Sequence, residues 1–164
     1  MTPGDNVMKR LAAAFAISAL AGPSFSQTPP AGPPPYGSPI QLEAAQALID
    51  KAVTASAARG FRMAVAVVEP SGELVAFVRM DDTQYGSIHV AQKKAATAAR
   101  YRSSTATMEE RTLAGRTVTL ANEDVLPIAG GLPIVVDVRI VGAIGVSGAA
   151  AAEDHEIAEA ALVR

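Results

Sequence analysis

The spacing of hydrophobic and polar residues predicts regular secondary structure along most of the chain. Small and apolar side chains recur at helical intervals over 42–56, and Gly60 follows where a C-terminal cap is expected. The apolar run 63–69 predicts a buried strand, Pro-Ser-Gly at 70–72 predicts a turn, and 73–80 alternates like a returning strand. These two strands are expected to form a β-hairpin.

Two further helices are expected in the middle of the chain. Ser87 can cap the first of them. Small side chains share one face of this helix: Ala91, Ala95, Ala98 and Ala99. Thr107 and Glu110 have the spacing of a capping box, which predicts a short helix after it.

The remaining pattern predicts a second hairpin and a final helix. The runs 125–137 and 139–148 read as strands, the first of them broken by Gly130–Gly131, and 151–163 reads as a helix. The whole order is helix, hairpin, helices, hairpin, helix. It predicts an antiparallel sheet covered by helices, in the α+β class.

The N-terminal part has a different composition and predicts export. Positive charges at Lys9–Arg10 precede the apolar run 11–21, and small residues follow up to Ser26. Residues 1–26 are therefore expected to be a cleavable signal peptide, with either Met1 or Met8 as the start, and the protein to be periplasmic or secreted. Residues 27–39 are rich in proline and are expected to form an extended linker before a domain at 40–164.

Composition and charge exclude several classes of protein. A net charge of −2, with no long basic cluster, argues against a partner nucleic acid. The apolar run near the N-terminus is too short for a transmembrane helix, so no membrane span is expected. The chain contains no cysteine and thus no disulfide. Aromatic residues make up 4% of the chain, so the core must be built from Ala, Val, Ile and Leu.

The glycine-rich segment 142–148 does not match a catalytic motif. The residue after Gly148 is Ala149, which rules out a G-x-S-x-G nucleophile elbow, and the segment lacks the ending of a phosphate-binding P-loop. A triad of Ser147, Asp154 and His155 is disfavoured, because neighbouring residues on a helix point about 100° apart. The favoured interpretation is structural, with glycines that let a strand lie close under a helix.

The chain has two histidines, His89 and His155, and both are candidate metal ligands. The common zinc sites need more histidine or cysteine ligands than this sequence offers. His155 and Glu159 have i, i+4 spacing, which suits either a weak metal site or an exposed helix-surface pair, and the second interpretation is favoured. For His89 the alternatives are a solvated helix face and an axial ligand or proton donor at a pocket.

Polar side chains are densest at 79–95, where the first hairpin leads into the following helix. Cationic groups in this segment could pair with an anionic ligand such as a carboxylate or a haem propionate. An Arg–Asp pair that holds the hairpin to the helix is the structural alternative. The residues concerned are Arg79, Asp81, Asp82, His89 and Lys94.

Four segments together resemble the GlcG/HbpS-like family, which is itself similar to the C-terminal domain of PduO-type corrinoid adenosyltransferases. The segments are VAVVEPSGELVAFVRMDD, SIHVAQKKAATAA, AGGLPI and VVDVRIVGAIGVSGAAAAEDHEIAEAAL. The resemblance covers about residues 40–163. The chain differs from the family pattern at Glu69, where aspartate is usual, and at Asp82, where glycine is typical.

The resemblance implies a profilin-like fold with a five-stranded antiparallel sheet flanked by helices, and assembly into a homo-oligomer. It further implies a small-molecule ligand, with haem as the expected cofactor, and a role in haem or iron scavenging or sensing in oxidative stress. His89 is the first choice of axial ligand, with Met80 or His155 as alternatives. Arg79 and Lys94 are expected to contact the propionates, with Asp81 beside them.

Two other functions remain open on the sequence alone. One is an enzyme acting on an organic acid, with Arg79 holding the carboxylate and Asp81, His89 or Lys94 as acid or base. The other is a structural or sensory partner protein without a ligand. The sequence leaves open whether the protein is an enzyme.

Overall fold

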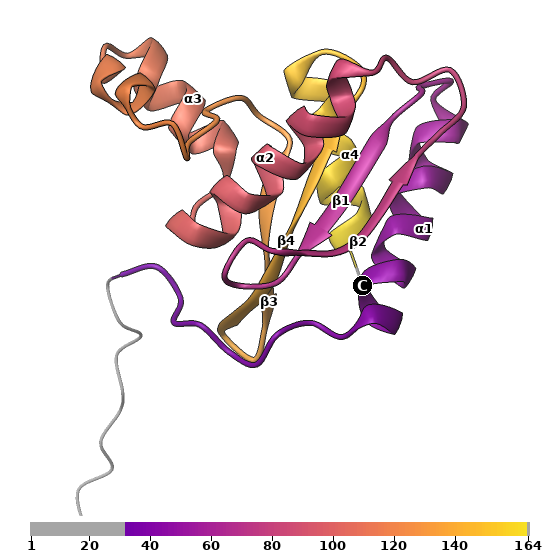
Figure 1. Ribbon diagram of the computed structural model, residues 1–164, viewed down its shortest axis with the longest axis horizontal. Coiled ribbons are helices and arrows are strands. Elements are labelled where there is room, and N and C mark those ends of the chain that lie inside the picture. The colour runs from indigo at the N-terminus through magenta and orange to yellow at the C-terminus, as the bar shows by residue number, and fades with distance from the viewer. Residues whose placement is uncertain (1–31, 164) are drawn as a thin grey trace, which may run out of the picture.

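A computed structural model describes residues 32–163, which form an antiparallel sheet with helices on both faces (Figure 1). The strand order is β2-β1-β4-β3. The strands are β1 (Ala64–Val68), β2 (Leu74–Arg79), β3 (Gly131–Val136) and β4 (Arg139–Ser147). The helices are α1 (Leu42–Ala58), α2 (Gly86–Tyr101), α3 (Thr105–Leu113) and α4 (Ala151–Leu162), with the short 3-10 helix η1 (Thr117–Ala121) after α3. The α+β prediction is confirmed.

The expected fifth strand is not present among the described residues, which form a four-stranded sheet. Beside the start of β4 runs the proline-rich segment before α1, and Tyr36 makes a single parallel bridge with Ile140. Prolines lack the N–H group that a ladder needs, so a segment that reads Pro-Pro-Pro-Tyr-Gly-Ser-Pro cannot extend this bridge into a strand.

The end of the predicted linker packs against the domain. Gly37 N donates to Ile140 O at 2.8 Å, and Ile40 N donates to Val141 O at 2.8 Å. The Tyr36 hydroxyl lies within hydrogen-bonding distance of the last carbonyls of α2, 2.8 Å from Arg100 O and 3.1 Å from Ala99 O. This contact ties the segment to α2 as well as to β4. The predicted signal peptide, 1–26, and the first part of the linker lie outside the described residues.

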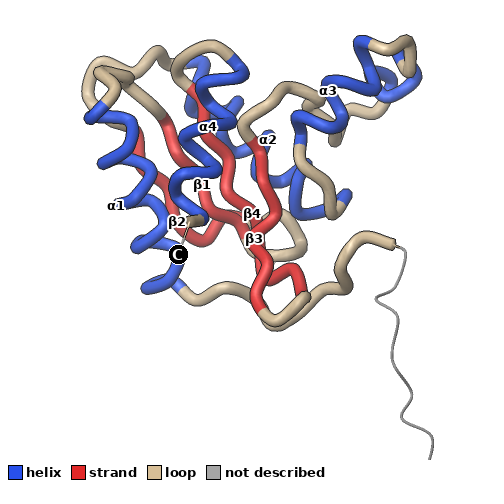
Figure 2. The backbone as a smooth tube through the Cα atoms, turned by 180° about the vertical axis from the view of Figure 1, so that it is seen from behind, coloured by secondary structure: helices blue, strands red, loops and turns tan. Residues whose placement is uncertain are grey.

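The two faces of the sheet are covered differently. Helices α1 and α4 lie together on one face, as seen from behind in Figure 2, and α2 lies on the other. Towards α1 and α4 the strands direct larger side chains, among them Val65, Val67 and Ile144. The side chains that the strands direct towards α2 are smaller, among them Ala64, Ala66 and Ala143. They meet the predicted alanine face of that helix, which consists of Ala91, Ala95, Ala98 and Ala99.

Gly145 shows how closely α2 approaches the sheet. A Cβ atom at this position would overlap the carbonyl oxygen of Ala91 and lie 2.6 Å from the amide nitrogen of Ala95. The structural interpretation of the glycine-rich segment thus fits the structure. Strand β4 lies so near α2 that only a residue without a side chain fits between them.

Both helix starts in the middle of the chain differ from prediction. Helix α2 begins at Gly86, and Ser87 is buried in its first turn, where its hydroxyl lies 3.2 Å from that of Ser147. Helix α3 is capped by Ser104, whose hydroxyl accepts from Thr107 N at 3.1 Å. The predicted capping box was wrong by three residues, because Ser104 offers the same chemistry one turn earlier.

The predicted strand 125–137 is shorter in the structure, where β3 begins at Gly131. Pro127 has no N–H to give to a ladder, and Leu126 N donates instead to the side chain of Thr97 at 3.0 Å. Gly130, at a φ of 122°, then turns the chain into β3. Within the described part of the chain, no helix is long and apolar enough to cross a membrane.

Candidate functional site

Some side chains of strand β2 point to the same face of the sheet as α2 but are not covered by that helix. Arg79 is paired with Ala64, and Phe77 with Ala66, whose side chains both point to α2. Directly opposite residues of paired strands share a face, so Arg79 and Phe77 lie on that side too, followed by Leu74 opposite Val68. Helix α2 packs mainly on β4, β1 and β3. Leu74 therefore remains 50% exposed and Phe77 partly exposed.

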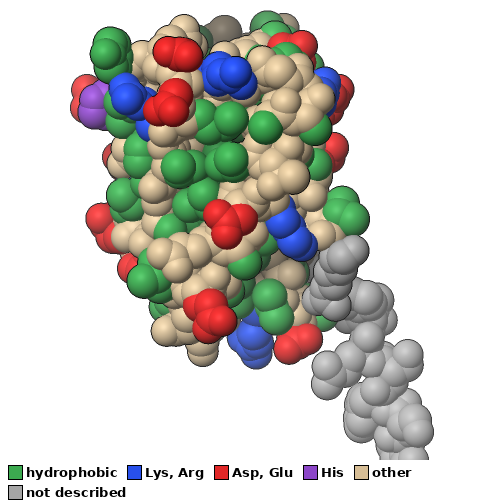
Figure 3. Space-filling model, turned by 90° about the vertical axis from the view of Figure 1, so that its right-hand side faces the viewer, with side chains coloured by type: hydrophobic (Ala, Val, Ile, Leu, Met, Phe, Trp, Pro, Cys, Tyr) green, Lys and Arg blue, Asp and Glu red, His purple; other side chains and the backbone are tan. Residues whose placement is uncertain are grey.

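A groove of about 340 Å³ runs between this part of β2 and the outer face of α2. The α2 side carries His89 and Lys93, which are four residues apart and therefore on one helix face, together with Ala96. Leu74 and Val68 supply apolar surface from the hairpin. This groove, between β2 and α2, is called the hairpin groove below. Figure 3 shows the side of the molecule next to it, where hydrophobic side chains lie between charged ones.

At the top of the same face, the loop after β2 forms a second hollow of about 490 Å³. It is lined by polar residues, including Arg79, Asp81 and Tyr85. The Arg79 guanidinium carbon lies 5.4 Å from the centre of the Tyr85 ring, which holds the charge over an aromatic face. Tyr85 is 77% exposed and lies one helical turn before His89. The structure thus brings Arg79, Asp81 and His89 to one side of the molecule.

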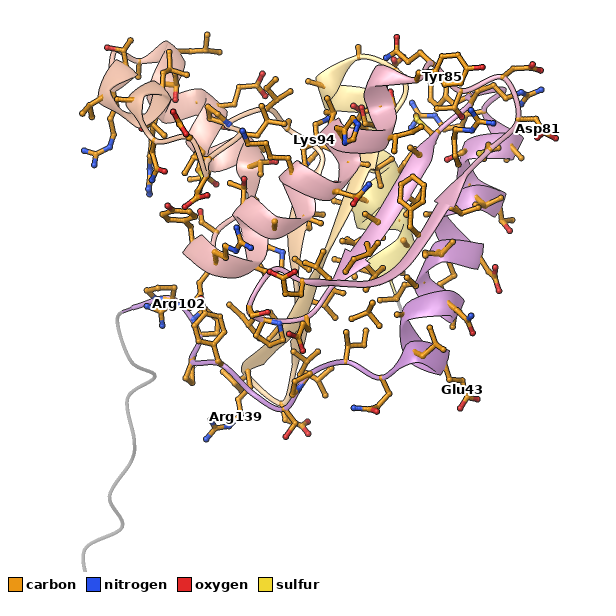
Figure 4. All side chains as sticks on the ribbon, viewed as in Figure 1. Glu43, Asp81, Tyr85, Lys94, Arg102 and Arg139 are labelled. Carbon is orange, nitrogen blue, oxygen red and sulfur yellow. The ribbon has the colours of Figure 1, made fainter. Side chains whose placement is uncertain are left out.

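Lys94 does not belong to this surface. Its ammonium nitrogen is buried, 2.6 Å from Asp154 Oδ2, and donates to Val146 O at 3.1 Å. Figure 4 shows Lys94 well apart from the labelled Asp81 and Tyr85. The expected contact of Lys94 with a ligand propionate does not fit the structure, because the Lys94 ammonium is buried and paired with Asp154. The neighbouring Lys93 is the exposed cation of the groove.

The Lys94–Asp154 pair is the centre of a buried polar cluster that joins α2 to α4. Burial raises the pKa of the Asp154 carboxyl above its usual range, although Lys94 and the N–H groups of Ala149 and Gly148 act in the opposite direction. A Cβ on Gly130 would lie 2.9 Å from both Lys94 Nζ and Asp154 Cβ, so the glycine is needed to admit the pair. Sequence reasoning missed this cluster.

Met80 and His155 lie away from the hairpin groove. Met80 packs against the core on the α1 side, where its sulfur lies 3.5 Å from Met63 N. His155 lies on α4, with Nε2 3.3 Å from Glu159 Oε1, so the predicted pair forms, although the imidazole is partly buried and not exposed as expected. Its Nδ1 is buried without a partner. No group of three His, Cys, Asp or Glu side chains suited to a metal occurs among residues 32–163.

The disfavoured catalytic triad also has no geometric support. Asp154 is engaged with Lys94 and with Ala149 N, which donates to its Oδ1 at 3.0 Å. The Ser147 hydroxyl is 3.2 Å from that of Ser87. Both groups therefore serve the interior of the fold, and His155 is not among their hydrogen-bond partners.

Comparisons with known proteins agree with the resemblance seen in the sequence. The family described as "Haem degrading protein HbpS-like" matches residues 40–163. Protein GlcG of Escherichia coli strain K12 is 36% identical over 108 residues, which cover 66% of this chain and 81% of GlcG. An uncharacterized 15.0 kDa protein of Citrobacter freundii, from the dhaT-dhaS intergenic region, is 33% identical over 100 residues, covering 58% of this chain and 70% of that protein.

Solved structures show the same fold. A crystal structure of HbpS superposes with a TM-score of 0.71 at 30% identity, covering 76% of this chain and 89% of that one. A crystal structure of a PduOC:heme complex superposes with a TM-score of 0.68 at 25% identity, covering 76% and 93%. The family match spans all the secondary structure of the described residues, and the chain therefore belongs to the HbpS-like family.

Proposed function

We propose that this protein binds haem in the hairpin groove, as an exported and oligomeric protein of the HbpS-like family. The observation that carries the proposal is the position of His89, exposed on α2 beside the uncovered apolar surface of β2. A protein of the same fold, PduOC, has been crystallised as a heme complex. An exposed imidazole next to an apolar surface is the chemistry that a haem iron and its macrocycle require.

The residues of the groove fit the group in kind. Leu74 in the groove offers apolar contact for the ring, with the partly exposed Phe77 near it on the same face of β2, and His89 offers a nitrogen ligand to the iron. Lys93 in the groove and Arg79 in the second hollow, both exposed, supply positive charge for the propionates. Lys93 takes the role that the sequence suggested for Lys94. In this arrangement the protein binds and orients the haem, and the haem supplies any redox chemistry.

The size of the groove supports assembly into a homo-oligomer. At about 340 Å³, it is at the small end of ligand pockets, which range from about 300 to 1,000 Å³. One chain therefore covers one side of a haem, and a second copy is needed to cover the other. This step rests on the proposed haem binding.

A titration of the purified protein with hemin tests the proposal. A saturable shift of the Soret absorption band is expected for the wild type. His89→Ala should abolish it or weaken binding at least tenfold, whereas His155→Ala, which removes the other histidine of the chain, should leave it unchanged. Equal effects of the two variants would contradict the assignment of His89.

The second hollow favours one alternative function, an enzyme acting on an organic acid. Arg79 and Asp81 line it, and His89 does not. If hemin fails to bind, and glycolate or a similar hydroxy acid binds in a manner that Arg79→Gln abolishes, this alternative replaces the haem proposal. Export is tested separately, by the mass of the protein purified from its own source. Loss of residues 1–26 is expected.

A further inference from the structure

A cavity separate from the hairpin groove lies beside the α3–η1 arm. The arm projects away from the sheet (Figure 1), and the cavity beside it has a volume of about 390 Å³ and is open to solvent. It is bounded by the end of α2, by α3 and by η1. None of the residues discussed for haem binding lines it.

Two arginines line this cavity, Arg111 and Arg116. No aspartate or glutamate is among the lining residues. Within residues 32–163, neither arginine belongs to an ion pair, whereas Arg59 and Arg100 each do. The cavity is therefore a place of uncompensated positive charge in a protein whose net charge is −2. Such a place favours an anionic ligand.

The backbone at the end of α3 holds the two arginines side by side. Arg116 N donates to Arg111 O at 2.9 Å, and Gly115 N donates to Thr112 O at 3.0 Å. These two bonds, with Gly115 at a φ of 103°, make a Schellman motif. The motif turns the chain back at the helix end. Arg116 thereby returns to the carbonyl of Arg111, so two cations that are five positions apart share one wall of the cavity.

The rest of the lining combines hydrogen-bonding groups with apolar surface. The Tyr101 hydroxyl accepts from Asn122 Nδ2 at 2.6 Å, which leaves the hydroxyl hydrogen to donate to a ligand. Met108, Val118 and Val125 supply hydrocarbon contact. A bare inorganic anion would use the charges and leave the apolar surface without a partner. A ligand with a hydrocarbon body and acidic groups would use both.

We propose that this cavity binds a small aliphatic dicarboxylate, independently of the haem site. Each guanidinium can take one carboxylate through paired hydrogen bonds. The short hydrocarbon chain between the carboxylates lies against Met108 and Val118, and the Tyr101 hydroxyl donates to one of the carboxylate oxygens. A cavity of about 390 Å³ has room for a ligand of this size.

Calorimetric titration of the purified protein with succinate tests the proposal. Saturable binding with one site per chain is expected, and added salt should weaken it. Arg111→Gln and Arg116→Gln should each weaken binding roughly tenfold or more, because each removes a charge-assisted pair of hydrogen bonds. Arg62→Gln is the matched control. It removes an exposed arginine that does not line the cavity and should leave succinate binding unchanged.

Gly115→Ala tests the geometry without removing a charge. A methyl group there meets no atom within 4 Å, so its effect comes from the left-handed backbone conformation, which disfavours alanine. Weaker succinate binding with a thermal transition still present is expected.

Three results would overturn the proposal: no binding of succinate to the wild type, equal binding by the Arg111→Gln/Arg116→Gln double variant, or inorganic phosphate binding as tightly as succinate. Hemin binding serves to separate the two sites. The double variant should bind hemin as the wild type does, so a failure at the arm would leave the haem proposal intact.

Discussion

The two faces of the sheet are built from different side chains, and they expose different amounts of the sheet. The face under α1 and α4 is filled by larger residues such as Val65, Val67 and Ile144. The face under α2 is filled by alanine and by Gly145. Two helices cover the first face across to β2, whereas α2 alone lies on the second and packs mainly on β4, β1 and β3.

This difference explains where the candidate site lies. Small side chains let α2 come close to the sheet, which gives tight packing with little apolar bulk per residue. A single helix that approaches so closely covers only part of a four-stranded sheet. The β2 side is left open, and Leu74 lines a groove together with His89, while Phe77 and Arg79 follow on the same face of β2. The groove thus follows from the fold of the α2 face.

The largest expected effect concerns the ion pair that joins the two faces. Lys94→Met leaves the Asp154 carboxylate buried without its partner, and should lower the free energy of unfolding by about 3–5 kcal/mol. Lys93→Met, on the exposed side of the same helix, should change it by less than about 0.5 kcal/mol. Urea denaturation of both variants measures the contrast. Similar losses would mean that the two adjacent lysines are not on opposite sides of the structure.

The next prediction compares the packing on the two faces directly. Gly145→Ala places a methyl group against the backbone of α2, which cannot move aside as a side chain can. We expect the free energy of unfolding to fall by about 3 kcal/mol, which is at the upper end of the losses seen when cores are overpacked. Ile144→Val, the neighbouring residue on the other face, should cost about 1 kcal/mol. If Gly145→Ala proves the milder of the two in the same denaturation experiment, the α2 face is not as closely packed as described.

The sequence predicted the parts of the fold that depend on local patterns. Hairpin β1–β2, helices α1 and α4, and the close contact at Gly145 all follow from periodicity or from the position of glycines. For the candidate site, the resemblance included Arg79, and the polar residues at 79–95 pointed to His89; the structure brings both to one side of the molecule, and their role in binding stays a prediction. Lys94 was assigned to the ligand because nothing near it in the sequence reveals its partner, Asp154.

Helical spacing was the signal that could have separated the two lysines. Lys94 lies on the same buried face as Ala91 and Ala98, whereas Lys93 is four residues after His89 on the outer face. The missing fifth strand and the early cap of α3 also had signals in the sequence, the prolines around Tyr36 and the serine at position 104.

A change of pH is expected to have a smaller effect on the free energy of unfolding. The pKa of Asp154 is raised in the folded protein, so between pH 4 and that raised value the folded state holds a proton that the unfolded state has released. The contribution of Asp154 to stability is therefore present at low pH and is lost as the pH rises through the folded pKa. The free energy of unfolding, relative to Asp154→Asn, should fall as the pH rises from 4 through the folded pKa. A rise would show that pairing with Lys94 outweighs burial.

The smallest expected change in stability concerns the segment before α1, where Tyr36 contacts the end of α2. Tyr36→Phe removes the hydroxyl that donates to the last carbonyls of α2, and should cost about 0.5–1 kcal/mol. Tyr85→Phe is the control, because Tyr85 is exposed at the other end of α2. Thermal unfolding followed by circular dichroism measures both. Equal transition temperatures for the two variants would show that the segment does not hold α2.

The central claim is that the uncovered part of the α2 face binds the ligand, and hemin affinity of two matched variants tests it most directly. Leu74→Glu places a charge in the hairpin groove, and Leu113→Glu places the same charge on the α3–η1 arm, where the leucine is 83% exposed. We predict that Leu74→Glu weakens hemin binding at least tenfold and that Leu113→Glu leaves it unchanged. Unchanged binding by Leu74→Glu would contradict the claim.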